Sequence, residues 1–213
     1  MTNLKLIIGN KNYSSWSLRP WILMKQFNIE FEEERVPLFT ATADDELRPY
    51  FSDCKVPVLV DSDFTVWDSL SIMEYVSEKY LHGSAWPAEI QARALARSVS
   101  AEMHSSFTQL RSECPMNCRE KFPDAKLSSG VERDIERIKL LWKRCKTAYG
   151  QGGEWLFGYF SIADAMFAPV VLRFIGFGVS FNKLESDYVD TLLKSVHIQA
   201  WIEAGRVEKE VIE

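Results

Sequence analysis

Residues 56–69 read VPVLVDSDFTVWDS, and this stretch decides the interpretation of the first part of the chain. Two short apolar runs, 56–60, which is entered through Pro57, and 64–67, flank a polar turn. Two strands joined by so short a turn form a β-hairpin. Asp68 then stands at the N-cap position of a segment whose apolar residues recur at helical spacing. The stretch therefore predicts strand, strand and helix in succession.

The residues before the hairpin predict a strand, a helix and a second strand. Residues 4–8 form a short apolar run that ends at a Gly-Asn pair, as a buried strand does. Apolar residues over 18–27 follow a serine-rich start at helical spacing, with Pro20 expected in the first turn. Residues 31–36 alternate apolar and charged side chains. The order βαβ, an irregular or helical link, then ββα predicts a mixed sheet with helices packed on it, its first two strands parallel.

The remainder of the chain predicts helices alone. Residues 82–87 carry loop residues and form the expected linker, which gives two domains, residues 1–81 and 88–213. Apolar stripes at helical spacing predict long helices over three ranges: 92–110, 135–149 and 189–201. A further helix that opens at Ser161 is apolar nearly all round, so it is expected inside the helical bundle.

Composition excludes several classes of protein. The 213 residues are 46% hydrophobic and 26% charged, as in ordinary globular proteins of one large or two small domains. Twenty-five basic against thirty acidic residues give a net charge of −5, which disfavours nucleic-acid and anionic-membrane binding. Nothing in the sequence reads as an export signal or a membrane span, so we expect a cytoplasmic protein whose four cysteines are reduced.

Metal and nucleotide sites find little support. The three histidines, His82, His104 and His197, are scattered, and the pair Cys114 and Cys118 lacks a second pair of ligands. Neither a GxGxxG motif nor a P-loop occurs. We therefore expect no metal and no dinucleotide cofactor, and a small-molecule or protein partner instead.

The serine-rich start of the first helix is the candidate reactive site. A thiol-redox enzyme needs a nucleophilic cysteine there, but this chain has Ser14, Ser15 and Ser17. Lowering the pKa of a bound thiol from about 8.5 by about two units requires roughly 2.7 kcal/mol. One hydrogen bond to the charged sulfur supplies about 1.5–3 kcal/mol, and the helix N-terminus adds about 0.3–1. A serine hydroxyl can therefore stabilise a thiolate without a side-chain base, although a serine here can equally be an ordinary N-cap.

These features resemble the cytosolic glutathione transferases over essentially the whole chain. The first domain is similar to their thioredoxin-like domain, and the rest to their helical domain. The stretch SSWSLR over 14–19 resembles the SSCSxR motif of the zeta class, the maleylacetoacetate isomerases, with Trp16 where that class has cysteine. Val56 and Pro57 resemble the cis-proline corner of the family. Ser161, with Asp164, resembles the capping box of its buried helix.

The resemblance implies glutathione as co-substrate and a role for each matching residue. Ser14 would donate the hydrogen bond to the glutathione thiolate, with Ser15 as the alternative. Val56, at the corner made with Pro57, would bind the cysteinyl unit through its main chain. Asp68 and Ser69 would bind the γ-glutamyl group. Arg19 is left between a structural and an electrostatic role, and the protein is expected to be a homodimer.

The electrophile is expected between the two domains, beside residues from both: Trp16, Met103, His104, Phe107 and Arg111. Arg111 or Arg173 would pair with a carboxylate if the electrophile is acidic. The reaction implied is conjugation of glutathione to an electrophilic carbon or, alternatively, thiolate-assisted cis/trans isomerisation. Two other hypotheses remain open: a non-catalytic interaction module with the same fold, and a thiol reductase, for which Cys54 is the first residue to examine.

Overall fold

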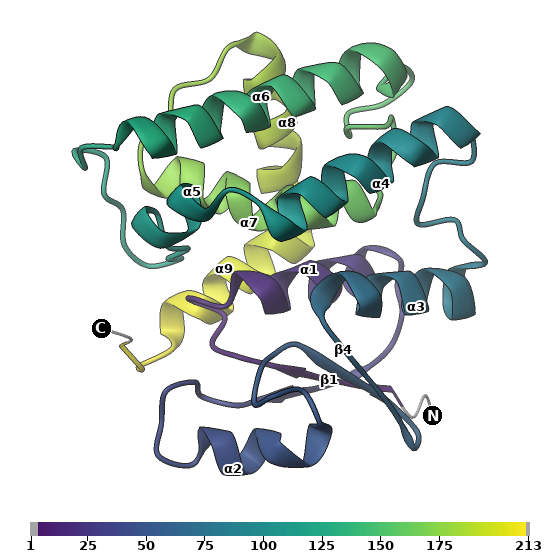
Figure 1. Ribbon diagram of the computed structural model, residues 1–213, viewed down its shortest axis with the longest axis vertical. Coiled ribbons are helices and arrows are strands. Elements are labelled where there is room, and N and C mark those ends of the chain that lie inside the picture. The colour runs from purple at the N-terminus through teal and green to yellow at the C-terminus, as the bar shows by residue number, and fades with distance from the viewer. Residues whose placement is uncertain (1–3, 212–213) are drawn as a thin grey trace.

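The computed structural model describes residues 4–211 and shows two layers, a sheet domain and a helical domain (Figure 1). The first domain contains these elements in chain order: β1 (Leu4–Ile8), α1 (Ser15–Gln26), β2 (Glu32–Arg35), α2 (Ala43–Leu47), the short 3-10 helix η1 (Arg48–Tyr50), β3 (Val58–Asp61), β4 (Phe64–Trp67) and α3 (Ser69–Leu81). The sequence predicted this order. It left the link between the two halves as irregular or helical, and the structure shows that the link is helical, with α2 and η1.

The sheet has the strand order β2-β1-β3-β4. β1 and β2 are parallel, whereas β3 runs antiparallel to both β1 and β4. The mixed sheet is therefore confirmed. Its two faces are both covered: α1 and α3 pack on one side, and Ala43 and Leu47 of α2 pack with Ile7 and Val58 on the other.

The helical domain follows after a turn-rich link. Its elements are α4 (Ile90–Ser105), α5 (Thr108–Glu113), α6 (Ser129–Tyr149), α7 (Ile162–Gly176), α8 (Lys183–Lys194) and α9 (Val196–Val207). Helix α7 is buried along nearly its whole length, as its apolar sequence predicts. The predicted capping box is present: the Ser161 backbone N–H donates to Oδ2 of Asp164 at 2.9 Å.

Two predicted helices are each broken in two. The apolar stripe over 92–110 continues through a break at Phe107, which has φ 62° and separates α4 from α5. The stripe over 189–201 crosses Ser195, where extended backbone separates α8 from α9. At the first break the apolar side chains stay buried, so their spacing alone did not reveal it. At the second break Val196, a member of the predicted stripe, is 72% exposed.

Helix α1 lies between the sheet and the helical domain, and this position creates the junction at which the two domains meet (Figure 1). It packs against α3, α7 and α9, and nine of its twelve residues are buried. Pro20 is not in the first turn as predicted but is the sixth residue of the helix. The N-terminal end of α1 opens at the edge of the junction, so the serines at this end face both domains.

Candidate functional site

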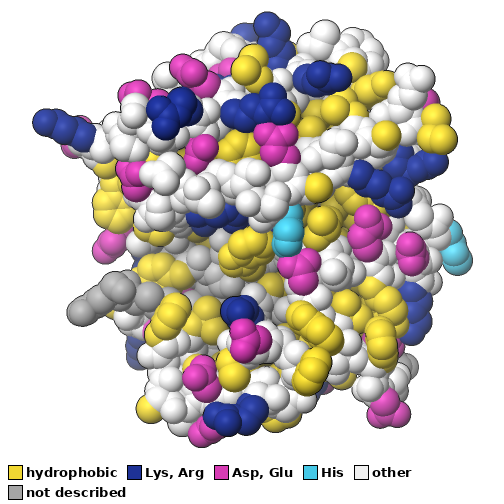
Figure 2. Space-filling view, in the orientation of Figure 1, with side chains coloured by type: hydrophobic (Ala, Val, Ile, Leu, Met, Phe, Trp, Pro, Cys, Tyr) yellow, Lys and Arg dark blue, Asp and Glu magenta, His cyan; other side chains and the backbone are white. Residues whose placement is uncertain are grey.

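A cavity of about 950 Å³ lies at the N-terminus of α1, between the two domains. The sheet domain contributes the serine loop, the proline corner and the start of α3, while α5, α7 and the chain after α5 close the other side. Figure 2 shows hydrophobic side chains gathered along the hollow between the two domains. Of the residues that the sequence singled out, these line the cavity: Ser14, Ser15, Trp16, Val56, Pro57, Asp68, Ser69 and Arg111.

Ser14 is the N-cap of α1, and its side chain is almost fully buried. Its Oγ accepts the Ser17 backbone N–H at 3.3 Å and lies 2.8 Å from Oγ of Ser17. Ser17 Oγ in turn accepts the Gly9 N–H at 3.1 Å. Ser14 is the donor in this contact with Ser17. Because hydroxyl protons can rotate, the two serines can exchange roles, and Ser14 then donates to a ligand in the cavity.

Ser15 is the first residue of α1 and contacts the helical domain. Its Oγ accepts a hydrogen bond of 3.1 Å from Nη2 of Arg173 in α7. A hydroxyl oxygen that accepts from a guanidinium keeps its own proton for another acceptor. Ser15 is therefore also placed to donate into the cavity, next to a positive charge.

Trp16 lies between two guanidinium groups. Cζ of Arg19 is 4.3 Å and Cζ of Arg111 is 4.8 Å from the centre of its ring. The ring of His104 meets Trp16 edge-on at 5.3 Å. Tryptophan is the aromatic side chain best suited to cation–π contacts, so Trp16 stabilises two cations that are withdrawn from water.

Three arginines bring positive charge close to the serine loop. Arg173 donates to the backbone oxygen of Cys114, and Nε of Arg111 donates to the Ser106 oxygen at 2.9 Å. Arg19, 1% exposed, donates to Oγ of Ser69 at 3.3 Å. Within the described range 4–211, no carboxylate oxygen lies within 4 Å of any of the three guanidiniums.

Burial and mutual repulsion lower the affinity of these groups for protons. Burial, followed by the charge of Arg111, lowers the pKa of Arg173 to about 10. Burial lowers the pKa of Arg19 well below its usual value, and the charges of Arg111 and Arg173 act in the same direction. An anion bound in the cavity would offset the burial of these guanidiniums and their mutual repulsion, because it would attract each of the positive charges.

Asp68 joins the sheet domain to α4. It has φ 72°, and its Oδ1 accepts the N–H groups of Leu70 and Ser71 at 2.9 and 3.1 Å. Its Oδ2 lies 3.2 Å from Nε2 of His104. Burial lowers the pKa of His104, an effect that Asp68 opposes and that Arg19 and Arg111 increase. The predicted N-cap at Asp68 is confirmed, and the lowered pKa of His104 favours its neutral imidazole at pH 7.

The proline corner has the predicted geometry. The peptide bond between Val56 and Pro57 is cis, and both residues line the cavity. Pro57 leads directly into β3, the neighbour of β1. Val56 therefore borders the cavity that the serine loop also lines.

Two predicted members of the electrophile wall are elsewhere. Met103 and Phe107 do not line the cavity but are buried in the hydrophobic core, at 2% and 5% exposure. Arg111, on α5 beyond the break at Phe107, does reach the cavity as predicted. His104 borders the site through Trp16 and Asp68 rather than lining the main cavity.

Residues that the sequence left undecided or unmentioned complete the wall. Arg173 lies inside an otherwise apolar helix, and a charged residue in such a helix is a visible signal of function or of a buried contact. Tyr13 also lines the cavity, and its hydroxyl receives a hydrogen bond of 2.6 Å from Arg119. No motif marks Arg119.

The cysteines differ in their access to the site. Cys54 is half-buried and lines the cavity. Burial raises the pKa of Cys114 to about 11 and that of Cys118 and Cys145 to about 12, so these three thiols stay protonated at neutral pH.

Known proteins are similar to this chain both in sequence and in fold. Residues 13–79 match the family described as glutathione S-transferase, N-terminal domain. "Glutathione S-transferase 1" of Dianthus caryophyllus is 28% identical over 207 residues, which cover 92% of this chain and 90% of the relative. "Probable maleylacetoacetate isomerase" of Caenorhabditis elegans is 25% identical over 175 residues, covering 80% and 79%.

A solved structure shows the same architecture. The glutathione transferase homolog from Burkholderia GL BGR1, described with bound glutathione, has a TM-score of 0.71 and 22% identity. The alignment covers 97% of this chain and 99% of that structure. Fold and cavity together define a two-domain protein with a thioredoxin-like sheet domain followed by a helical domain. The chain has the glutathione S-transferase fold, and its residues 13–79 match the N-terminal domain of that family. Across residues 4–211, none of the helices combines the length and apolar character that crossing a bilayer requires.

Proposed function

We propose that this protein is a glutathione transferase that uses a serine hydroxyl at the start of α1 to hold the glutathione sulfur as a thiolate. The observation that carries the proposal is the cavity itself. It brings Ser14 and Ser15 together with the cis-proline corner and with the Asp68-Ser69 pair, more than 40 residues later in the sequence. The glutathione-bound homolog of the same fold and the transferase relatives support it.

Each segment has a part in the proposed reaction. The carboxylate of Asp68 and the hydroxyl of Ser69 bind the γ-glutamyl end, and the main chain of Val56 binds the cysteinyl unit. The thiol proton passes to solvent as the thiolate forms, stabilised by the serine hydroxyl and by the positive end of α1. The sulfur then forms a bond to the electrophilic carbon, and the leaving group departs with its electron pair. The nearby charges of Arg111 and Arg173 favour the thiolate further.

Either serine satisfies the geometry, so a matched pair of variants is needed to distinguish them. Ser14→Gly removes the hydroxyl while keeping most of the N-cap, because glycine at an N-cap costs only a few tenths of a kcal/mol. Ser15→Ala removes the other hydroxyl. Ser98→Ala is the control, since the Ser98 hydroxyl bonds within its own helix, to the Ala94 oxygen at 3.0 Å.

The readout is the absorbance of the bound thiolate, titrated with pH in each variant. We expect the variant that lacks the activating hydroxyl to raise the pKa of bound glutathione by about one to two units, the loss of one charged hydrogen bond. Ser98→Ala should match the wild type. If the wild-type protein fails to bind glutathione, or if neither serine variant changes the titration, the proposal is wrong.

A second activity has a specific observation in its favour. Arg111 and Arg173 line the cavity without a carboxylate partner among residues 4–211, which suits an electrophile that itself carries a carboxylate. In the isomerase alternative the sulfur adds to a cis double bond of such an acid, the resulting single bond rotates, and the sulfur leaves unchanged. The similarity to the probable maleylacetoacetate isomerase supports this alternative.

A substrate panel separates the two activities. Maleyl acids and neutral aryl halides are assayed side by side with glutathione. Isomerisation predicts turnover of the maleyl acids without consumption of glutathione, whereas conjugation consumes one glutathione for each product. As further parts of the proposal, we place the protein in the cytoplasm and expect it to form a homodimer. Light scattering of the purified chain tests the dimer.

A further inference from the structure

The loop of residues 10–14, which joins β1 to α1 and carries Ser14, is held from outside by the segment that follows α9. Within the loop, the Asn10 oxygen accepts the N–H groups of Tyr13 and Ser14 at 3.1 and 2.7 Å. These two bonds make a tight turn. The N–H groups of Lys11 and Asn12 point out of the turn and need partners elsewhere.

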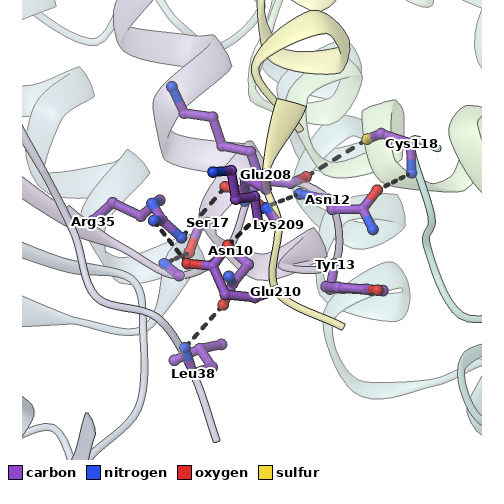
Figure 3. Close-up of polar contacts among 12 residues, drawn as sticks. Asn10, Asn12, Tyr13, Ser17, Arg35, Leu38, Cys118, Glu208, Lys209 and Glu210 are labelled. Carbon is purple, nitrogen blue, oxygen red and sulfur yellow. Dashed lines mark hydrogen bonds and ion pairs between the residues drawn. The ribbon is translucent and has the colours of Figure 1, made fainter. Parts of the chain in front are cut away.

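Glu208 supplies both partners with one carboxylate. Its Oε1 accepts the Lys11 N–H at 2.7 Å, and its Oε2 accepts the Asn12 N–H at 3.0 Å. The Glu208 side chain is only 7% exposed. Figure 3 shows it reaching the loop from the segment after α9, across 196 residues of sequence. Hydrogen bonds to an ionised carboxylate are roughly twice as strong as neutral ones, so this contact is the strongest that the turn makes.

The opposite side of the loop is held by the chain after α5. Oδ1 of Asn12 accepts the backbone N–H of Cys118 at 2.8 Å (Figure 3). It also accepts the backbone N–H of Arg119 at 3.1 Å. The loop backbone also packs directly on α9 at Gly205, where a Cβ atom would lie 3.0 Å from the Asn12 nitrogen. The turn therefore has fixed contacts on both sides.

Arg119 fixes the segment after α9 in place. Its Nη1 donates to the backbone oxygen of Glu208 at 2.7 Å, and its Nη2 donates to the backbone oxygen of Glu210 at 2.8 Å. Nη2 also donates to the hydroxyl of Tyr13 at 2.6 Å, and both Tyr13 and Val211 line the cavity. The same guanidinium thus joins the segment to the residue immediately before Ser14.

The basic side chains near Glu208 leave its carboxylate free to bind the Lys11 and Asn12 amides. Nη1 of Arg35 lies 3.8 Å from its Oε1, while the Lys11 ammonium turns away to pair with Glu33 at 2.6 Å. Arg35 also pairs with Glu210 at 2.9 Å. Glu210 therefore shares the arginine with Glu208, but among residues 4–211 its side chain accepts no hydrogen bond from the loop.

We propose that Glu208 is a positioning residue for the thiol-activating serine: by binding the Lys11 and Asn12 amides, its carboxylate sets the place of the Ser14 hydroxyl in the cavity. Glu208 itself does not line the cavity, so it acts through the loop. The catalytic part of this inference rests on the proposed function. The structural part, that Glu208 holds the loop, does not.

The structural part is tested by amide hydrogen exchange in the ligand-free protein. Glu208→Gln keeps the shape of the side chain but removes the charge and one acceptor oxygen. Glu210→Gln is the matched control, with the same change two residues along the chain. We expect Glu208→Gln to speed exchange of the Lys11 and Asn12 amides roughly tenfold or more, and Glu210→Gln to change it by less than about twofold. Equal exchange in the two variants overturns the inference.

The catalytic part is tested by titrating bound glutathione in the same variants. Glu208→Gln should raise the pKa of the bound thiolate and lower kcat at fixed pH, with a smaller change in KM for glutathione, while Glu210→Gln matches the wild type. Faster exchange without a change in the thiolate titration overturns the positioning role. If Glu208→Gln does not fold, Arg119→Gln replaces it and should produce the same changes by loosening the segment.

These outcomes are distinguishable from failure of the proposed function. A wild-type protein that takes up no glutathione disproves the transferase proposal, and with it the catalytic part of this inference. The exchange comparison then still decides whether Glu208 holds the loop.

Discussion

Nη2 of Arg173, on the buried helix α7, donates a hydrogen bond of 3.1 Å to Oγ of Ser15, the first residue of α1. The bond joins the two domains at the wall of the cavity, which both residues line. Burial and the charge of Arg111 lower the pKa of Arg173 to about 10. This value is still well above 7, so the guanidinium carries its charge at neutral pH. A hydroxyl polarised in this way is a better donor to a thiolate than a free serine.

We predict that Arg173→Met weakens thiolate formation. Removal of the charge should raise the pKa of bound glutathione and lower kcat/KM about tenfold at pH 7, the effect of losing about 1.4 kcal/mol of stabilisation. Thiolate absorbance and steady-state kinetics measure both. Arg173→Lys keeps the charge but lacks the planar, forked set of N–H donors. Its pKa of bound glutathione and its kcat/KM should lie between those of the wild type and of Arg173→Met. An Arg173→Met variant that folds and titrates like the wild type shows that the charge does not act on the sulfur.

We predict that Asp68→Asn weakens glutathione binding about tenfold with little change in kcat. Asparagine tolerates the positive φ of this position and caps helices as well as aspartate, so the fold should be retained. The lost charge removes the partner of the glutathione ammonium group. Calorimetry measures the affinity. Asp63→Asn, in the exposed hairpin turn, is the control, and equal affinities of the two variants would exclude a binding role for Asp68.

The sequence predicted those features whose signals are local. The hairpin, the N-cap at Asp68 and the capping box at Ser161 each depend on residues a few positions apart, and all three are present. The break at Phe107 escaped because apolar side chains at helical spacing lie on both sides of it, and burial rather than helix continuity maintains that spacing.

The contacts that the sequence did not predict join distant segments. Arg173 meets Ser15 across 158 residues and Glu208 meets Asn12 across 196. An arginine or a glutamate on a helix or after one is most often solvated, so neither residue type marks such a contact in advance. Only the packing of α7 and α9 against α1 brings these side chains to the serine loop.

We predict that Asp164 stabilises the fold in a pH-dependent manner. Its side chain accepts hydrogen bonds from the N–H groups of Leu156 and Ser161 and from the Ser161 hydroxyl, so Asp164→Asn should lower the free energy of unfolding by about 1–3 kcal/mol. Burial raises the pKa of this carboxyl from 3.8 to about 6. The folded state therefore binds a proton more tightly than the unfolded state between those values.

The sign of the pH effect follows from that difference. The contribution of Asp164 to stability is full below about pH 4 and declines as pH rises toward 6. Urea unfolding of the wild type and of Asp164→Asn at several pH values measures it. The stability difference between the two should shrink from pH 4 to pH 6 and stay constant above. A difference that grows over this range would show that the carboxyl is ionised throughout.

We predict that Gly205→Ala disturbs the serine loop, whereas Gly176→Ala does not. At Gly205 a Cβ atom would lie 3.0 Å from the nitrogen and 3.1 Å from Cα of Asn12, and both are backbone atoms that cannot rotate away. Gly176 is the last residue of α7 and has no atom within 4 Å of its Cβ position among those described. Both changes replace glycine by alanine in a helix, which by propensity alone adds up to about 1 kcal/mol of stability.

The two variants therefore separate helix propensity from contact with the loop. Gly205→Ala should lower the free energy of unfolding by about 1–3 kcal/mol through overpacking, and Gly176→Ala should leave it unchanged or raise it. Denaturant unfolding measures stability, and exchange of the Lys11 and Asn12 amides measures the loop. If Gly205→Ala is as stable as Gly176→Ala and exchanges these amides no faster than the wild type, the loop does not depend on close packing against α9. The contact with Glu208 would then have to hold the turn without support from the helix behind it.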